Sequence, residues 1–233
     1  MIKPIAILCT KYSIAADWHQ GDASGVLLTF VGFGSSKKNS SNFVARIVKE
    51  TGLSALVVDL SGHGDSPFNV EHTTPAQHIQ EAVAAYDWIV SSYPGTSVYV
   101  MGTSYGGFVS AYLSKFRTVQ KLVLRTPAIY EPSALFTRHQ LIDKIKVREY
   151  RKSSEPVSRH PLFAQDGVIE PRALLIVHGE DESVPVETAD VYRDKFNAEV
   201  YVAEGFSHSF RDPSNPQEGI EPYYARIIGW LSR

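Results

Sequence analysis

Short apolar runs alternate along the chain with stretches of helical periodicity. Residues 4–17 have the pattern of one or two antiparallel edge strands. Further strands are predicted at 26–31, 56–60, 98–101, 121–125, 173–178 and 199–203. Helices are predicted at about 39–50, 75–93, 108–116, 185–196 and 221–231. This alternation predicts an α/β fold with a mostly parallel, doubly wound sheet and flanking helices.

The segment 128–165 interrupts the alternation. It has a polar middle, contains no long buried-strand pattern, and lies between two predicted core strands, so we interpret it as a small cap or lid. The segment contains seven Lys or Arg residues and four Asp or Glu residues, so its net charge is about +3. These cations form either an ordinary solvated surface or a site that attracts anionic substrate.

Composition narrows the class of protein. A chain of 233 residues suits one α/β domain over 1–233, and a net charge of −2 favours neither nucleic acid nor a membrane surface as partner. The single cysteine, Cys9, lies in an apolar run, so we expect a core residue in a reducing compartment. The opening apolar stretch is too short for a signal peptide, and no window is long enough to span a bilayer. We therefore expect a cytoplasmic protein.

Chemistry is indicated first by residues 97–109. The strand pattern is followed at once by Gly-x-Ser-x-Gly centred on Ser104 and then by a helical stretch. A strand, a sharp turn and a helix would expose the Ser104 hydroxyl, and Gly102, Gly106 and Gly107 would supply room. The Tyr105 amide would then lie at a helix N-terminus, ready to donate to an oxyanion. The alternative is a tight turn with an incidental serine.

A nucleophilic serine needs a histidine base and a carboxylate that orients it. In an open α/β sheet, functional residues gather beyond the carboxyl ends of the strands. Asp181 and His208 follow the last two predicted strands, and both come after Ser104. Because Glu180 and Glu182 flank Asp181, the residues alone leave the acid open among three carboxylates.

The other histidines receive less specific interpretations. We expect His63, flanked by glycines, to shape its loop, and His178, at a strand end, to be a buried supporting residue. The remaining ones carry no pattern and are expected at the surface: His19, His72, His78, His139 and His160.

Five separated motifs together resemble the α/β-hydrolase superfamily over essentially the whole chain. They lie at 31–34, 59–66, 102–107, 178–185 and 205–208. The Ser-Gly-His-Gly-Asp-Ser loop is similar to that of lysophospholipases, monoacylglycerol lipases and cinnamoyl esterases. The Ser-Tyr-Gly-Gly elbow is more similar to prolyl oligopeptidase and dipeptidyl-peptidase catalytic domains.

The resemblance implies an oxyanion hole made by the backbone amides of Phe33 and Tyr105. Val31 stands where the usual His-Gly motif has histidine, which bears on the rigidity of the loop rather than on its donors. The acid motif is one residue short. Aligned from Val184 it gives Asp181, and aligned from His178 it gives Glu182. We choose Asp181 because that alignment fixes the exit of the loop into the next helix.

These observations predict a serine hydrolase, foremost a carboxylesterase that cleaves small or medium acyl esters through an acyl-enzyme. The catalytic residues would be Ser104, His208 and Asp181, with no metal or organic cofactor. We expect a small-molecule ester as substrate, and the sequence does not give the oligomeric state. The alternatives are a small serine peptidase or acyl-peptide hydrolase, and a binding protein without activity on a hydrolase scaffold.

Overall fold

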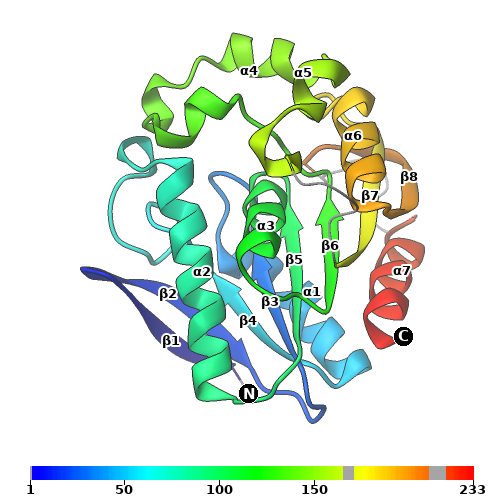
Figure 1. The fold of residues 1–233 in the computed structure, drawn as a ribbon. Helices are drawn as coiled ribbons and strands as arrows, with labels where there is room; N and C mark the ends of the chain where they lie inside the picture. The colour runs from blue at the N-terminus through cyan, green and yellow to red at the C-terminus, as the bar shows by residue number, and fades with distance from the viewer. Residues whose placement is uncertain (1, 165–170, 210–218) are drawn as a thin grey trace.

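One sheet organises the computed structural model, which describes residues 2–164, 171–209 and 219–233. In these residues the sheet has eight strands in the order β1-β2-β4-β3-β5-β6-β7-β8 (Figure 1). The β1–β2 and β2–β4 pairs are antiparallel and all other pairs are parallel. The strands are β1 Ile2–Cys9, β2 Tyr12–His19, β3 Val26–Phe30, β4 Ser54–Val58, β5 Val98–Thr103, β6 Lys121–Arg125, β7 Arg172–Glu180 and β8 Glu199–Ser207.

This arrangement confirms the predicted mostly parallel sheet with an antiparallel edge. Because β3 pairs in parallel with both β4 and β5, and β5 to β8 continue in parallel, these strands all end at one side of the sheet. The loops after β3, β5, β7 and β8 therefore meet above that side.

Helices cover both faces of the sheet, so an apolar layer lies between sheet and helices on each face. Leu28 belongs to the apolar layer that includes residues of α2, α3 and α6 on one face, and its neighbour Leu27 belongs to the layer that includes residues of α1 and α7 on the other. The helices are α1 Lys37–Thr51, α2 Pro75–Ser92, α3 Tyr105–Phe116, α6 Val186–Phe196 and α7 Ile220–Ser232. As predicted, Thr74 caps α2, with its Oγ1 accepting from Gln77 N at 3.2 Å, and Cys9 is buried.

Residues 128–164 form short helices beyond the carboxyl ends of the strands, at the top of Figure 1. No strand occurs within 128–164, and residue 165 of the expected cap lies outside the described residues. The helices are η2 Pro132–Phe136, η3 His139–Leu141, α4 Lys144–Arg151, α5 Ser154–Ser158 and η4 Pro161–Phe163; a further short helix, η1 Val70–His72, precedes α2.

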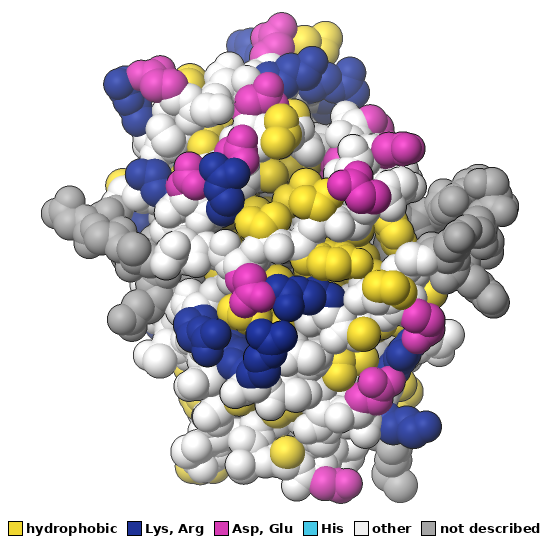
Figure 2. All heavy atoms as spheres, turned by 90° about the vertical axis from the view of Figure 1, so that its right-hand side faces the viewer, with side chains coloured by type: hydrophobic (Ala, Val, Ile, Leu, Met, Phe, Trp, Pro, Cys, Tyr) yellow, Lys and Arg dark blue, Asp and Glu magenta, His cyan; other side chains and the backbone are white. Residues whose placement is uncertain are grey.

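The opposite edge of the sheet from β1 is formed by β8. Val200 and Val202 on β8 are 38% and 45% exposed. Figure 2 shows hydrophobic side chains gathered in a band across this face, between charged ones. Among the described residues, no helix is both long and apolar enough to cross a membrane.

Three glycines allow α3 to start directly over the sheet. A Cβ atom on Gly102 would lie 2.2 Å from the Gly106 oxygen, and one on Gly106 would lie 2.3 Å from the Phe30 oxygen. A Cβ atom on Gly107 would lie 2.9 Å from Pro127 Cβ. Any side chain at Gly102 or Gly106 would therefore push against backbone, and the sequence-based expectation that these glycines supply room is confirmed.

The expectation that five histidines lie at the surface is wrong for four of them. His72 is exposed, whereas His19, His78, His139 and His160 are buried. Three of these imidazole rings, those of His78, His139 and His160, pack among aromatic side chains; His160, for example, packs against Phe108 and Tyr112. Its Nδ1 accepts from Leu162 N at 3.0 Å, so a neutral ring satisfies the backbone there. Burial lowers the pKa of His160 to about 4.

Gly106→Ala should destabilise the fold because the new methyl group meets the Phe30 carbonyl of a buried strand. We expect the free energy of unfolding to fall by about 1–3 kcal/mol, measured by urea denaturation. The matched control is Gly229→Ala in α7, where nothing lies within 4 Å of the added Cβ. That change should be neutral or stabilising by up to about 1 kcal/mol. Equal stability of the two variants would contradict the crowding.

The buried histidines should make stability fall in mild acid. His160 has a pKa of about 4 in the folded state against about 6.5 when unfolded, so below pH 6.5 the unfolded chain binds a proton that the folded chain does not. The contribution of the neutral His160 ring to stability is thus complete above pH 6.5 and is lost as the pH falls toward 4. His160→Asn, which keeps an acceptor for Leu162 N, should lose about 1–2 kcal/mol less than wild type between pH 7 and pH 5. His72→Asn, at the exposed histidine, should follow wild type, and identical curves for all three proteins would refute this account.

Candidate active site

Ser104 occupies the turn between β5 and α3 in a conformation that few side chains adopt. Its backbone has φ 52° and ψ −114°. A positive φ in a residue other than glycine is uncommon and costs on the order of 1–3 kcal/mol. Three backbone hydrogen bonds hold it there: Ser104 N donates to Arg125 O at 2.8 Å, and Ser104 O accepts from Phe108 N at 3.1 Å and from Ala128 N at 3.0 Å. The side chain is thereby held at the turn, beyond the end of the strand.

The structure brings the three predicted residues into one chain of hydrogen bonds. Ser104 Oγ lies 2.8 Å from His208 Nε2, and His208 Nδ1 lies 2.8 Å from Asp181 Oδ2. The loops after β5, β7 and β8 supply one residue each. An Nδ1–H that donates to the carboxylate leaves Nε2 free to accept the serine proton. The arrangement can therefore activate a hydroxyl as a nucleophile.

Asp181 is fixed so that only one of its oxygens faces the imidazole. Its Oδ1 accepts from Ser183 N at 2.8 Å and from Val184 N at 2.7 Å. Burial opposes ionisation, but the hydrogen bonds from His208, Val184 and Ser183 outweigh it and hold the pKa of Asp181 below its ordinary value. The carboxylate is thus charged at neutral pH.

The neighbouring Glu182 takes a different place. Its side chain is exposed, and its Oε2 accepts from the backbone N of His208 at 3.3 Å rather than from the ring. Of the two acids that the sequence alignment offered, the one in contact with the His208 ring is Asp181.

His178 supports the loop that carries His208. Its Nδ1 lies 2.7 Å from Ser207 O and its Nε2 lies 3.2 Å from Tyr223 Oη. A carbonyl can only accept, so Nδ1 carries the proton and Nε2 accepts from the tyrosine. Burial lowers the pKa of His178 to about 4, in keeping with a neutral ring. The predicted supporting place of His178 is therefore observed.

The loop after β3 lies beside the serine. A Cβ atom on Gly32 would be 3.7 Å from Ser104 Cβ, which places the adjoining Phe33 next to the elbow. Tyr105 N is the first amide of α3. Within the described residues neither the Phe33 nor the Tyr105 amide donates to a protein acceptor. Backbone amides without a protein acceptor are the kind of donor that can bind an oxyanion.

Sequence reasoning missed an aromatic layer beneath these amides. The Tyr105 hydroxyl lies 2.6 Å from His78 Nδ1 and 3.3 Å from His139 Nε2. The exposed Phe33 ring packs on it, with centroid distances of 4.9 Å to His139 and 5.6 Å to both His63 and Tyr105. Burial lowers the pKa of His139 to about 4 and that of His78 well below its usual value, so the layer is uncharged at neutral pH. The two residues with free amides are thus held by one packed group.

His63 is part of the same layer, and its buried ring fits the predicted role in shaping its loop. Its Nδ1 lies 3.2 Å from Ser61 O, and its backbone N donates to Leu60 O at 2.9 Å. No local sequence signal marked this layer, because its five members come from five separate segments of the chain: Phe33, His63, His78, Tyr105 and His139.

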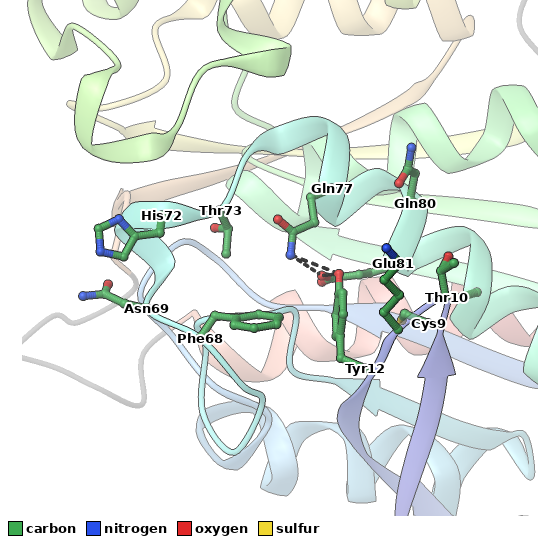
Figure 3. A pocket seen from close by; sticks show the side chains of 12 residues that line it. Cys9, Thr10, Tyr12, Phe68, Asn69, His72, Thr73, Gln77, Gln80 and Glu81 are labelled. Atoms are coloured by element: carbon green, nitrogen blue, oxygen red, sulfur yellow. Dashed lines mark hydrogen bonds between the residues drawn. The ribbon is translucent and has the colours of Figure 1, made fainter.

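The surface of the protein has two hollows that bear on the search for a site. One of about 250 Å³ lies between Phe33 and Ser183, under α4. A larger one, about 540 Å³, lies by the β1–β2 turn and contains none of the candidate site residues. In that second hollow Tyr12 Oη and Gln77 Nε2 both bind Glu81 Oε1, at 2.5 and 3.1 Å (Figure 3). Nowhere in the described ranges do three His, Cys, Asp or Glu side chains come together in a way that could hold a metal ion.

One family model matches more than half of the chain. Residues 21–163 match the model of the family described as serine aminopeptidase, S33. No curated protein sequence matches significantly.

Solved structures share the fold over the whole chain. An esterase from Pyrobaculum calidifontis has a TM-score of 0.75 and 17% identity, covering 100% of this chain and 84% of its own. The esterase Pf2001 from Pyrococcus furiosus gives 0.73 and 19%, covering 100% and 92%. Est1E from Butyrivibrio proteoclasticus, solved with ferulic acid, gives 0.73 and 16%, covering 98% and 100%. At these identities the likeness establishes the α/β-hydrolase fold.

Substitution of the two acids should separate their roles. Asp181→Asn should slow the reaction of Ser104 with a fluorophosphonate by a factor on the order of 10³ to 10⁴, because the imidazole loses its orienting charge. Glu182→Gln should stay within about threefold of wild type, since an exposed carboxylate contributes little. Labelling rates followed by intact mass give the comparison. A larger loss in Glu182→Gln than in Asp181→Asn would reverse the assignment.

Proposed function

The chain belongs to the serine aminopeptidase S33 family, and we propose that this member is a serine carboxylesterase acting on small or medium acyl esters. One observation carries the proposal: the continuous hydrogen-bonded chain from Ser104 through His208 to Asp181, with both distances at 2.8 Å. A binding protein without activity would have no need of it. No cofactor enters the proposed reaction.

The proposed first step is attack of Ser104 Oγ on the ester carbonyl carbon. His208 Nε2 takes the hydroxyl proton, and the Asp181 carboxylate stabilises the imidazolium that forms. The carbonyl oxygen becomes an oxyanion that the Phe33 and Tyr105 amides would bind. Collapse of this intermediate expels the alcohol, which takes the proton from His208, and leaves an acyl group on Ser104.

In the proposed second step water hydrolyses the acyl-enzyme. His208 accepts a proton from water while the oxygen attacks the same carbonyl, and the oxyanion again lies at the two amides. His208 then returns the proton to Ser104 Oγ as the carboxylic acid leaves. The aromatic layer keeps both donors in place through the cycle, so little reorganisation is needed.

The charge beside the site favours an ester over an aminopeptidase substrate. An aminopeptidase must bind the protonated amino group of its substrate, which needs carboxylates or other acceptors. The hollow beside Phe33 is instead lined by Lys144, Arg148 and Arg151, and no Asp or Glu is among its described lining residues. The esterases of the same fold from Pyrobaculum calidifontis and Pyrococcus furiosus add support.

A small serine peptidase is the second candidate, favoured by the description of the matched family. Both reactions would use the same three residues, so the leaving group distinguishes them. We further propose that residues 128–165 act as a cap of this single domain, because their short helices lie beyond the strand ends where the site is.

Ester and amide turnover should differ strongly. We expect hydrolysis of 4-nitrophenyl acetate to exceed that of alanine 4-nitroanilide by at least about 100-fold in kcat/KM. Ser104→Ala should lower ester turnover by a factor on the order of 10⁴ to 10⁶ while circular dichroism stays unchanged. Comparable turnover of the anilide would favour the peptidase, and full activity of Ser104→Ala would exclude the proposed nucleophile.

A further inference from the structure

The hollow of about 250 Å³ beside Phe33 carries a cationic rim and an apolar floor. Lys144, Arg148 and Arg151, all on α4, contribute the charge. Val147 on the same helix is 6% exposed and, with Tyr130, belongs to the apolar lining. A ligand with an anionic end and a short hydrocarbon part would match this division.

These three cationic side chains do not form the close ion pairs with carboxylates that several arginines of the chain form. Arg46, Arg117 and Arg193 each pair with carboxylates. Among the described residues, no carboxylate oxygen lies within the 4.0 Å ion-pair distance of Lys144, Arg148 or Arg151. The lining of the hollow therefore carries three cationic side chains that form no close ion pair within the described part of the protein.

Arg151 fixes this charge relative to the reacting groups. Its Nε donates to Ile129 O at 2.9 Å and its Nη1 donates to Ser183 O at 3.1 Å, with the guanidinium 5.0 Å from the Tyr130 ring centroid. These acceptors belong to the two loops that hold the site: Ala128, next to Ile129, binds Ser104 O, and Ser183 N binds Asp181 Oδ1. Arg151 thus joins the loop after β6, which holds the backbone of Ser104, to the loop after β7, which carries Asp181.

We propose that the substrate is an ester that bears a carboxylate, separated from the ester bond by a short apolar spacer. The carboxylate would pair with Lys144 and Arg148, the exposed members of the rim, while the spacer lies along Val147 and Tyr130. This inference rests on the proposed esterase function and names its substrate class. Arg151 is a positioning residue because its hydrogen bonds join the two loops.

Matched substrate pairs test the charge. The monoethyl ester of adipic acid carries the carboxylate on the acyl side, and ethyl hexanoate is its neutral counterpart. 4-Acetoxybutanoate carries it on the alcohol side, and butyl acetate is the neutral counterpart. For at least one pair we expect the anionic ester to have the higher kcat/KM at low salt, with an advantage that shrinks in 0.5 M NaCl.

The rim is tested by Lys144→Gln/Arg148→Gln, with Lys146→Gln as control because that lysine is on α4 but does not line the hollow. The double variant should lower kcat/KM for the favoured anionic ester by about fivefold or more, mainly through KM, since each exposed ion pair is weak. Its neutral counterpart should change less than about twofold, and Lys146→Gln should change neither ester by more than that.

Three outcomes would overturn the inference: no preference for the anion in either pair, an equal loss on charged and neutral esters, or an equal effect of Lys146→Gln. If wild type cleaves none of the four esters, the proposed function itself fails. Cleavage of neutral esters without a charge effect rejects only the substrate class.

Discussion

Backbone crowding at the start of α3 is the constraint on which the site depends. The helix begins so close to β3 and β5 that Gly102 and Gly106 leave no space for a Cβ atom. This close approach makes a strand end at Thr103 and a helix begin at Tyr105, with a single residue between them at positive φ. The strain at Ser104 is offset by hydrogen bonds to the next strand and to the loop after it. The same geometry puts the first amide of α3 beside the hydroxyl.

Around this turn the buried histidines are neutral, whereas the Asp181 carboxylate is charged. The aromatic layer under Phe33 and Tyr105 is neutral because burial lowers the pKa values of its histidines. Asp181 keeps its charge because three hydrogen bonds outweigh burial. In the proposed mechanism the Asp181 carboxylate stabilises the imidazolium, and the amides of Phe33 and Tyr105 would bind the developing oxyanion.

Much of the fold could be predicted because it follows from local pattern. The apolar run 121–125 is β6 itself, and Thr74 with Pro75 starts α2 as predicted. Ser104 and His208 could be located because each follows a strand in a parallel sheet. The buried His78 and His139 could not, since their surroundings come from segments far apart in sequence. The sequence motif could be aligned to give either Asp181 or Glu182 as the acid. Only the structure distinguishes the two, because the Asp181 side chain is the one that contacts the His208 ring.

Activation of Ser104 is the central claim, and reaction with a fluorophosphonate tests it most directly. Folded wild-type protein should gain the mass of one adduct, and peptide mapping should locate that adduct on Ser104. Ser104→Ala, folded as judged by circular dichroism, should gain none. An unlabelled wild type, or an adduct that maps elsewhere and persists in Ser104→Ala, would contradict the account.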